Sequence, residues 1–132
     1  HFVTRKITAG VAAIAQGRAD RLELGTLDVS RDWGWAPDYV LAMWLMLQHD
    51  VPGDYIVASG CSRTLRDFLS TAFACVGIDD WAPYVVSDES LVRPAEVVGL
   101  VGDPAKARRT LGWEPTVPFE EIVARMVAHD LA

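Results

Sequence analysis

The segment from Tyr39 to Leu47 contains no charged side chain and consists only of aliphatic, methionine and aromatic residues. Pro37 and Asp38 precede it, and both residues are favoured in the first turn of a helix. A helix that is apolar on every side has to be covered on every side, and this one is much too short for a bilayer, which needs roughly 20 such residues. The sequence therefore predicts a core helix between two layers of structure.

The stretch just before this helix, RDWGW at residues 31–35, combines charge with aromatic rings. Two interpretations of Arg31 and Asp32 stay open. They pair with each other at the surface, or Arg31 offers its guanidinium to an anionic ligand at the mouth of the helix, where two parallel hydrogen bonds to a phosphate are favourable.

The composition indicates a globular chain and excludes several kinds of partner. The chain has 132 residues, of which 51% are apolar, and a net charge of −6, which fits one domain with a core of useful size. An acidic chain is a poor general binder of nucleic acid or anionic membrane, so an anionic ligand needs a few local Arg and Lys side chains. Cys61 and Cys75, with no signal-like start, fit a reducing cytoplasm. The scattered histidines have no metal-site spacing.

Apolar periodicity and turn residues predict alternating strands and helices. A first amphipathic helix is expected from about residue 4 to Gln16, and Tyr55–Ala58, an apolar run, is expected to be a strand buried on both faces. The other expected elements are a strand at 21–27, a helix after the N-cap Thr64 up to Gly77, a strand at 84–86, a short helix from 103 to 111 and a last helix from Pro118. The alternation predicts an α/β fold in which residues 1–132 form a single unit.

Three further features suggest a ligand site, each with a plain structural alternative. Arg5 and Lys6 lie near the start of the first helix, where positive charge is unfavourable, although both could be ordinary solvated charges. Pro94 holds Arg93 in an extended conformation suited to phosphate, unless Arg93 simply pairs with Glu96. Gly25 in the expected strand marks a close approach of a ligand or is a turn glycine.

Motifs for redox or acid–base catalysis are absent from the chain. It contains no G-x-G-x-x-G for a dinucleotide, no Tyr-x-x-x-Lys pair, no G-x-S-x-G elbow and no P-loop. It also starts without Met, already in helical rhythm, which suggests a piece of a longer protein. We therefore expect no catalytic residue within these 132 positions.

Four stretches, in their order and spacing, resemble the C-terminal part of GDP-mannose 4,6-dehydratases. They are FVTRKIT at residues 2–8, LELGTLDVSRDWG at 22–34, RPAEV at 93–97 and GDPAKARRTLGW at 102–113. RDWG occurs in many nucleotide-sugar enzymes, whereas FVTRKI together with RPAEV and GDPxKA is more specific. The resemblance covers essentially the whole chain. The family belongs to the extended short-chain dehydrogenase/reductases, so the resemblance implies the C-terminal substrate-binding part of a Rossmann-like enzyme whose N-terminal Rossmann core is absent.

The resemblance implies an activity and a set of binding residues. Family enzymes hold NADP and their catalytic groups in the N-terminal domain and convert GDP-mannose to GDP-4-dehydro-6-deoxy-mannose, and the full-length protein is expected to be a cytoplasmic homo-oligomer. The C-terminal part binds the GDP portion. The implied contacts are Val3 and Lys6 with guanine, Leu24 and Gly25 beside the nucleotide, Arg31 and Arg93 with the pyrophosphate, and Glu96 with the ribose hydroxyls.

The sequence departs from the family pattern at three places. Thr26 stands where an Asn is common after the strand glycine, and Trp35 stands where a His is common after RDWG. SDESLV also replaces the usual aromatic segment before RPAE. Two alternatives remain: a related nucleotide-sugar epimerase or reductase, and a non-catalytic remnant or interaction module that uses an exposed helix face.

Overall fold

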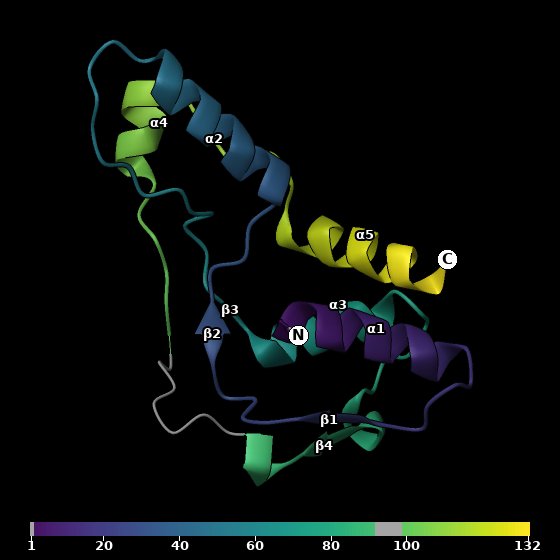
Figure 1. The fold of residues 1–132 in the computed structure, drawn as a ribbon. Coiled ribbons are helices and arrows are strands. Elements are labelled where there is room, and N and C mark those ends of the chain that lie inside the picture. Colours follow the sequence, from purple (N-terminus) through teal and green to yellow (C-terminus); the bar gives the residue numbers. More distant parts are fainter. Residues whose placement is uncertain (1, 92–98) are drawn as a thin grey trace.

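The computed structural model describes residues 2–91 and 99–132, which form short strands and longer helices (Figure 1). The elements in chain order are α1 (Val3–Ala15), β1 (Leu22–Leu24), β2 (Ser30–Arg31), α2 (Ala36–Gln48), β3 (Arg63–Thr64), α3 (Leu65–Ala74), η1 (Ala82–Tyr84), β4 (Val85–Ser87), η2 (Glu89–Leu91), α4 (Ala105–Leu111) and α5 (Phe119–Leu131). The α/β class predicted from the alternation is confirmed, although its strands are short.

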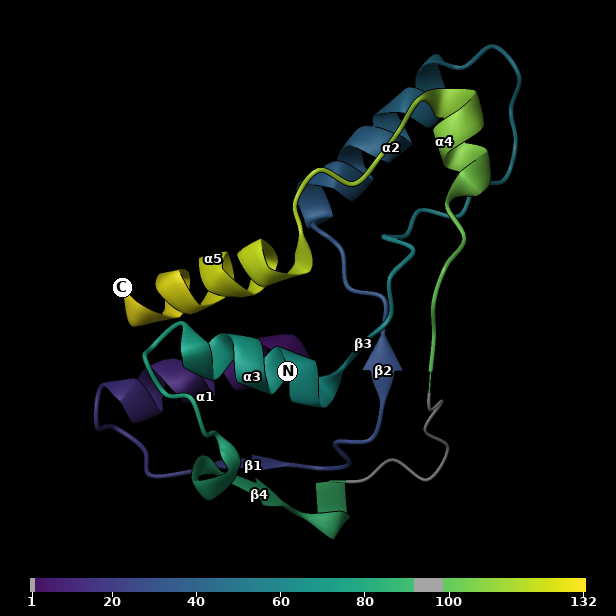
Figure 2. The same ribbon diagram turned by 180° about the vertical axis from the view of Figure 1, so that it is seen from behind.

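The main core lies between α1, α3 and α5. Figures 1 and 2 show α1 and α3 side by side, with α5 on one side of them and the β1–β4 pair on the other. β1 and β4 are parallel, in a register that pairs Leu22 with Val85 and Leu24 with Ser87. The side chains that fill this core recur at helical spacing along α1 and α3, which explains why these segments fold as helices against it; they include Ile7, Val11, Phe68, Leu69 and Phe73.

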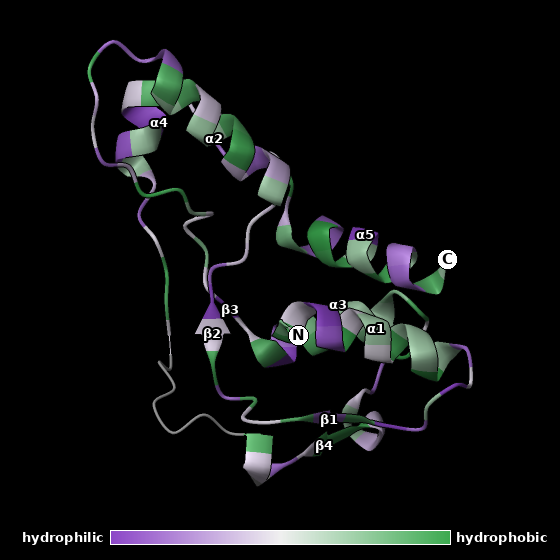
Figure 3. Ribbon diagram, viewed as in Figure 1, coloured by the Kyte–Doolittle hydropathy of each residue, from purple (hydrophilic) through white to green (hydrophobic). Residues whose placement is uncertain are grey.

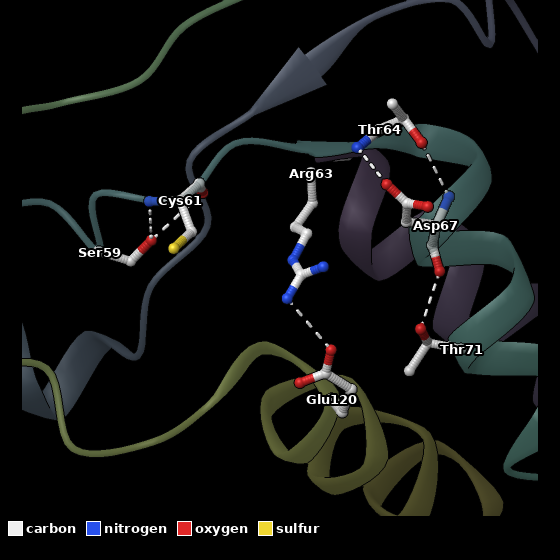
Figure 4. A network of polar contacts seen from close by, with 7 residues as sticks. All are labelled: Ser59, Cys61, Arg63, Thr64, Asp67, Thr71 and Glu120. Atoms are coloured by element: carbon white, nitrogen blue, oxygen red, sulfur yellow. Dashed lines mark hydrogen bonds and ion pairs between the residues drawn. The ribbon is translucent and has the colours of Figure 1, made fainter.

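Two polar interactions, a capping box and an ion pair, stabilise the helices of this core. At the start of α3, the Thr64 hydroxyl accepts a hydrogen bond from the Asp67 amide at 3.0 Å, and the Asp67 carboxylate accepts one from the Thr64 amide at 2.8 Å (Figure 4). This reciprocal capping box confirms the prediction that Thr64 is the N-cap of the helix. Arg5 of α1 forms an ion pair with Asp130 of α5, whose side chain is almost entirely buried.

A second, smaller cluster joins α2 to α4 around the buried indole of Trp113. The indole N–H donates to the Asp38 carbonyl at 2.8 Å. The Asp38 carboxylate accepts from the Thr116 amide, the Thr116 hydroxyl and the Val117 amide, at 2.8, 2.7 and 3.3 Å. Asp38 therefore fastens the first turn of α2 to the segment that leads into α5.

The expectation that α2 is covered on every side is wrong for the part of the chain that the structure describes. Only one side of α2 packs against α4 and Trp113. The opposite side leaves apolar side chains exposed to between 45% and 82%, namely Val40, Leu41, Met43, Trp44 and Leu47. Figure 3 shows hydrophobic colouring along much of this helix. No other element within residues 2–91 and 99–132 lies over that side.

The expected strand Tyr55–Ala58 is also corrected. Its backbone pairs with no strand among the described residues, because the four paired strands lie elsewhere in the chain. Ile56 is exposed, whereas Ala58 is buried. The apolar run is therefore extended chain that has the composition of an internal strand but no neighbour in a sheet.

The remaining expectations differ only in length. α1 and α3 occupy the predicted positions, and α3 ends at Ala74, three residues before Gly77. The strand expected over 21–27 is limited to Leu22–Leu24. None of the helices in the described ranges combines the length and the hydropathy that crossing a membrane requires.

Asp38→Ala is expected to lower the free energy of unfolding by about 2–3 kcal/mol, because it leaves three donors without their charged acceptor. Burial raises the pKa of the Asp38 carboxyl, but the hydrogen bonds from Thr116 and Val117 and the charge of Arg125 outweigh burial, and the pKa lies below its ordinary value of 3.8. The contribution is thus present in full above pH 3.8 and is lost as the pH falls through the lower, folded-state pKa.

Urea denaturation at several pH values measures both effects. Asp28→Ala is the control, since Asp28 is exposed and pairs only across the surface with Arg66, where such pairs contribute about 1 kcal/mol or less. Equal stability of Asp38→Ala and the wild type at neutral pH would contradict the role given to Asp38.

Candidate functional site

A groove of about 550 Å³ lies at the carboxyl end of β1, between the start of α1 and the β2 segment. Ligands of α/β proteins commonly bind outside the carboxyl ends of parallel strands, so the position itself suggests a binding site. Five residues singled out from the sequence line this groove: Val3, Lys6, Leu24, Gly25 and Arg31.

These five residues come from three separate places in the chain. The first turn of α1 supplies Val3 and Lys6, the end of β1 supplies Leu24 and Gly25, and β2 supplies Arg31. Their convergence depends on α1 packing against the β1–β4 pair. Arg93 and Glu96, the other two predicted contacts, lie outside the described residues.

Two cationic side chains, Lys6 and Arg31, and several apolar side chains line the groove. The Arg31 guanidinium donates a hydrogen bond to the Ser30 carbonyl at 2.8 Å. Lys6 lies near the loop after β4: hydrogen bonds from Ser90 lower the pKa of the Asp88 carboxyl, and the Lys6 charge lowers it further. Val3, Leu24 and Leu91 supply apolar surface. This combination suits a ligand with an anionic part and a flat, apolar part.

Asp32, which also lines the groove, has a structural role that the sequence did not reveal. Its carboxylate accepts hydrogen bonds from the backbone amides of Ser59 and Gly60, both at 2.9 Å, and of Gly102 at 3.3 Å. Burial raises the pKa of this carboxyl, but the hydrogen bonds from Ser59, Gly60 and Gly102 together lower it. Asp32 therefore stays ionised and joins three distant segments at one end of the groove.

Arg5 and Lys6, which the sequence analysis considered together as possible ligand contacts, lie in different environments. Lys6 lines the groove, whereas Arg5 pairs with Asp130 of α5. The two residues are adjacent, and successive helical positions point about 100° apart, so only one of them faces the groove.

Two of the three departures from the family pattern, Thr26 and Trp35, lie in different environments. Thr26 lines the groove, and its hydroxyl accepts from the Asp28 amide at 3.3 Å. The Trp35 ring lies 5.0 Å from the guanidinium carbon of Arg125 on α5. Trp35 thus supports the contact of α5 with the start of α2, and Thr26 is the departure that changes the groove itself.

A second hollow, of about 300 Å³, lies between β3 and the start of α5. Arg63 extends across it toward α5 (Figure 4), with a guanidinium nitrogen 3.4 Å from a Glu120 oxygen and its carbon 5.4 Å from the centre of the Phe119 ring. Cys61 lies at its edge as a free, exposed thiol. Because Arg63 is engaged with α5, we assign these contacts to the packing of α5. No group of three or more potential metal ligands occurs within residues 2–91 and 99–132.

A parallel strand pair backed by helices, with a groove at the carboxyl end of β1, is the arrangement of an α/β protein with a candidate ligand site. The chain belongs more narrowly to the GDP-mannose 4,6-dehydratase family: the family model described as GDP-mannose 4,6 dehydratase matches residues 1–126.

Individual relatives agree with this assignment. The chain is 50% identical over 131 residues to GDP-mannose 4,6 dehydratase 2 of Arabidopsis thaliana, a match that covers 99% of this chain and 35% of that protein. It is 43% identical over 156 residues to GDP-mannose 4,6-dehydratase of Yersinia enterocolitica, covering 98% and 42%. The structure of RMD from Pseudomonas aeruginosa complexed with NADPH is similar with a TM-score of 0.85 at 26% identity, covering 98% and 42%. The chain thus spans well under half the length of these relatives.

Asp32→Ala is expected to speed amide hydrogen exchange at Ser59, Gly60 and Gly102. Removing the shared acceptor costs about 2 kcal/mol locally, or roughly thirtyfold in exchange rate. The matched control is Asp67→Ala, which removes another carboxylate that accepts from a backbone amide and should speed exchange at Thr64 alone. Exchange at Ser59 and Gly60 that is the same in both variants would contradict the assignment.

Proposed function

We propose that this chain supplies the GDP-sugar-binding part of a GDP-mannose 4,6-dehydratase, which converts GDP-mannose to GDP-4-dehydro-6-deoxy-mannose. The single observation that carries the proposal is the convergence on one groove of Val3, Lys6, Leu24, Gly25 and Arg31. Membership of the GDP-mannose 4,6-dehydratase family supports GDP-mannose as the substrate in this proposal. In this proposal residues 1–132 act as one binding unit.

The chemistry of the groove supports a nucleoside diphosphate. The diphosphate of a GDP-sugar is a dianion, and the chain as a whole carries a charge of −6, so binding requires placed donors. Arg31 can offer two parallel N–H groups to one phosphate, and a charged hydrogen bond of this kind is stronger than a neutral one. Lys6, at the other wall, is a donor for the guanine base, and Val3 and Leu24 are apolar surfaces for its faces. Gly25 lacks a side chain that would obstruct the nucleotide.

Arg93 and Glu96 complete the proposed contacts. A second guanidinium on the same diphosphate would balance its remaining charge, and a carboxylate can accept hydrogen bonds from two ribose hydroxyls. Both residues follow β4 and η2 in the chain; η2 ends at Leu91, which lines the groove. This connection supports their assignment to the same ligand.

NADP and the catalytic groups are proposed to lie in the part of the relatives that this chain does not match. The chain contains neither the glycine fingerprint that lets a backbone approach a pyrophosphate nor a Tyr-x-x-x-Lys pair. When bound, NADP supplies the hydride acceptor and donor for the sugar. The residues of this chain hold the nucleotide end of the substrate, so that the sugar is presented to the catalytic groups in a fixed orientation.

Two unpaired cysteines, Cys61 and Cys75, are exposed. Free exposed thiols are typical of reducing compartments, which supports a cytoplasmic enzyme. We propose a homo-oligomer for the full-length protein from the resemblance alone.

Arg31→Ala is expected to weaken GDP-mannose binding by about 1.5–3 kcal/mol, or roughly tenfold to more than a hundredfold in Kd, because a charged hydrogen bond to phosphate is lost. Arg93→Ala should weaken binding by a similar amount. Calorimetry on a chimera, in which this chain replaces the matched part of the Arabidopsis enzyme, measures both. Arg109→Ala removes an exposed arginine of α4 outside the groove and is the control. If both Arg31→Ala and Arg93→Ala bound GDP-mannose as tightly as the unsubstituted chimera, the assignment of the groove as the GDP-mannose site would be wrong.

The isolated chain is expected to show no dehydratase turnover when GDP-mannose and NADP are added, because it lacks catalytic groups. The chimera should be active. Conversion of GDP-mannose, followed by chromatography of the nucleotide sugars, tests both. Turnover by the isolated chain would mean that a catalytic residue lies among these 132 positions.

A further inference from the structure

Thr26 is a polar residue of the groove that the contacts described so far leave without a role toward the ligand. It follows Gly25 directly, just after the end of β1, and it is the only residue with a hydroxyl group among the described residues that line the groove. Its position is also one of the three at which the sequence departs from the family pattern. Unlike the charged groups of Lys6, Arg31 and Asp32, a hydroxyl can both donate and accept a hydrogen bond.

The loop that carries Thr26 is anchored on both sides. The Gly25 carbonyl accepts a hydrogen bond from the Ser87 hydroxyl of β4 at 3.0 Å. The Asp28 carboxylate accepts two hydrogen bonds from the Arg66 guanidinium, at 3.1 and 3.3 Å. Threonine is also β-branched, which restricts rotation about its Cα–Cβ bond. The fold therefore holds the Thr26 hydroxyl at a defined place on the groove wall.

The hydrogen bonds of this loop use the hydroxyl oxygen of Thr26 but not its proton. The oxygen accepts from the Asp28 amide at 3.3 Å. Because the amide hydrogen approaches the oxygen from one side, the hydroxyl proton has to point in another direction. No group within residues 2–91 and 99–132 accepts this proton. The O–H group is therefore available to a ligand in the groove.

A phosphate oxygen is the acceptor that fits this group best. A hydrogen bond from a hydroxyl to a charged oxygen is short and roughly twice as strong as one between neutral groups. A guanine ring and a ribose present only neutral acceptors, to which the same donor contributes less. The groove also contains the Asp32 carboxylate, so a neutral donor adds to the binding of an anion at a place where the surrounding charges are mixed.

We propose that Thr26 determines specificity in the groove: its hydroxyl donates a hydrogen bond to an oxygen of the diphosphate and thereby favours nucleoside diphosphates over nucleosides. The presence of a GDP-sugar in the groove rests on the proposed function. The contact of Thr26 is additional to it, because Thr26 is not among the residues on which the proposed function depends.

Thr26→Val and Thr26→Ser separate this contact from an effect on the shape of the loop. Valine has the shape of threonine without the hydroxyl, whereas serine keeps the hydroxyl and loses only a methyl group. In the chimera described above, Thr26→Val should weaken GDP binding roughly tenfold and leave guanosine binding within about twofold, because guanosine has no phosphate. Thr26→Ser should bind GDP within about twofold of the unsubstituted chimera. Calorimetry measures all four affinities.

Thr71→Val is the matched control. Thr71 lies on α3 outside the groove, and its hydroxyl also makes one hydrogen bond, to the Asp67 carbonyl at 2.8 Å. This substitution should change neither affinity. If Thr26→Val weakened GDP and guanosine binding equally, the residue would act through the loop and the proposal would be wrong. Unchanged GDP binding in Thr26→Val, or a tenfold loss in Thr26→Ser, would also overturn it.

Steady-state kinetics of the chimera give a second readout. A hydrogen bond to the diphosphate is made in the ground state and in the transition state alike. Thr26→Val should therefore raise the KM for GDP-mannose roughly tenfold and leave kcat within about twofold. A fall in kcat at unchanged KM would place Thr26 in the chemical step and would contradict the contact with the diphosphate.

The outcomes also distinguish this inference from the proposed function. If Arg31→Ala weakens GDP-mannose binding and Thr26→Val does not, only the role of Thr26 is wrong. If the chimera shows the expected pattern with GDP and guanosine but neither binds nor converts GDP-mannose, only the proposed function is wrong. A chimera that does not bind GDP would contradict both.

Discussion

The carboxylate of Asp32 connects the segments that surround the candidate binding groove. It lies directly after Arg31, on the wall of the groove, and it accepts backbone hydrogen bonds from Ser59, Gly60 and Gly102. Segments separated by about 30 and 70 positions in the chain are thus held beside the residue that is proposed to meet the diphosphate. An anionic side chain that is fully engaged with amides does not repel an anionic ligand as strongly as an unpartnered one, since the amide dipoles offset its charge. The arrangement therefore places a carboxylate on the wall of the groove with less repulsion toward an anionic ligand than an unpartnered carboxylate would cause.

Asp38 has the same role for the second half of the molecule. It ties the first turn of α2 to Thr116 and Val117, just before α5. Because α5 also pairs with α1 through Asp130 and Arg5, α1, which supplies Lys6, and α2, which precedes the extended segment Tyr55–Ala58, are connected through α5. Both carboxylates have pKa values below the ordinary range, and this preference for the ionised form is what keeps the connections intact at neutral pH.

The sequence predicted those features that depend on neighbouring residues. The periodicity of α1, the cap at Thr64 and the motifs around Lys6, Gly25 and Arg31 are local, and the structure brings these three residues to one groove. It did not predict the partners of Asp32, because hydrogen bonds to distant backbone amides leave no signature in side-chain spacing. The prediction that α2 is covered on every side was wrong for the described residues. Hydropathy indicates that burial of a helix face is favourable, but it does not indicate which part of a polypeptide covers that face. The prediction of a strand at Tyr55–Ala58 was wrong for a similar reason. Its residue types are typical of a strand, but a strand also needs a neighbouring strand to pair with.

The unpaired run Tyr55–Ala58 also has a consequence for how such a polypeptide can exist in a cell. Apolar, uncharged extended stretches can add to like segments, but the segments that form fibrils are usually six or seven residues long, whereas this run has four. Pro52 and Gly53 on one side and Ser59 and Gly60 on the other interrupt it, and they limit how far such stacking could extend. The length of the run and the residues that flank it thus keep an unpaired, apolar backbone compatible with a dispersed polypeptide.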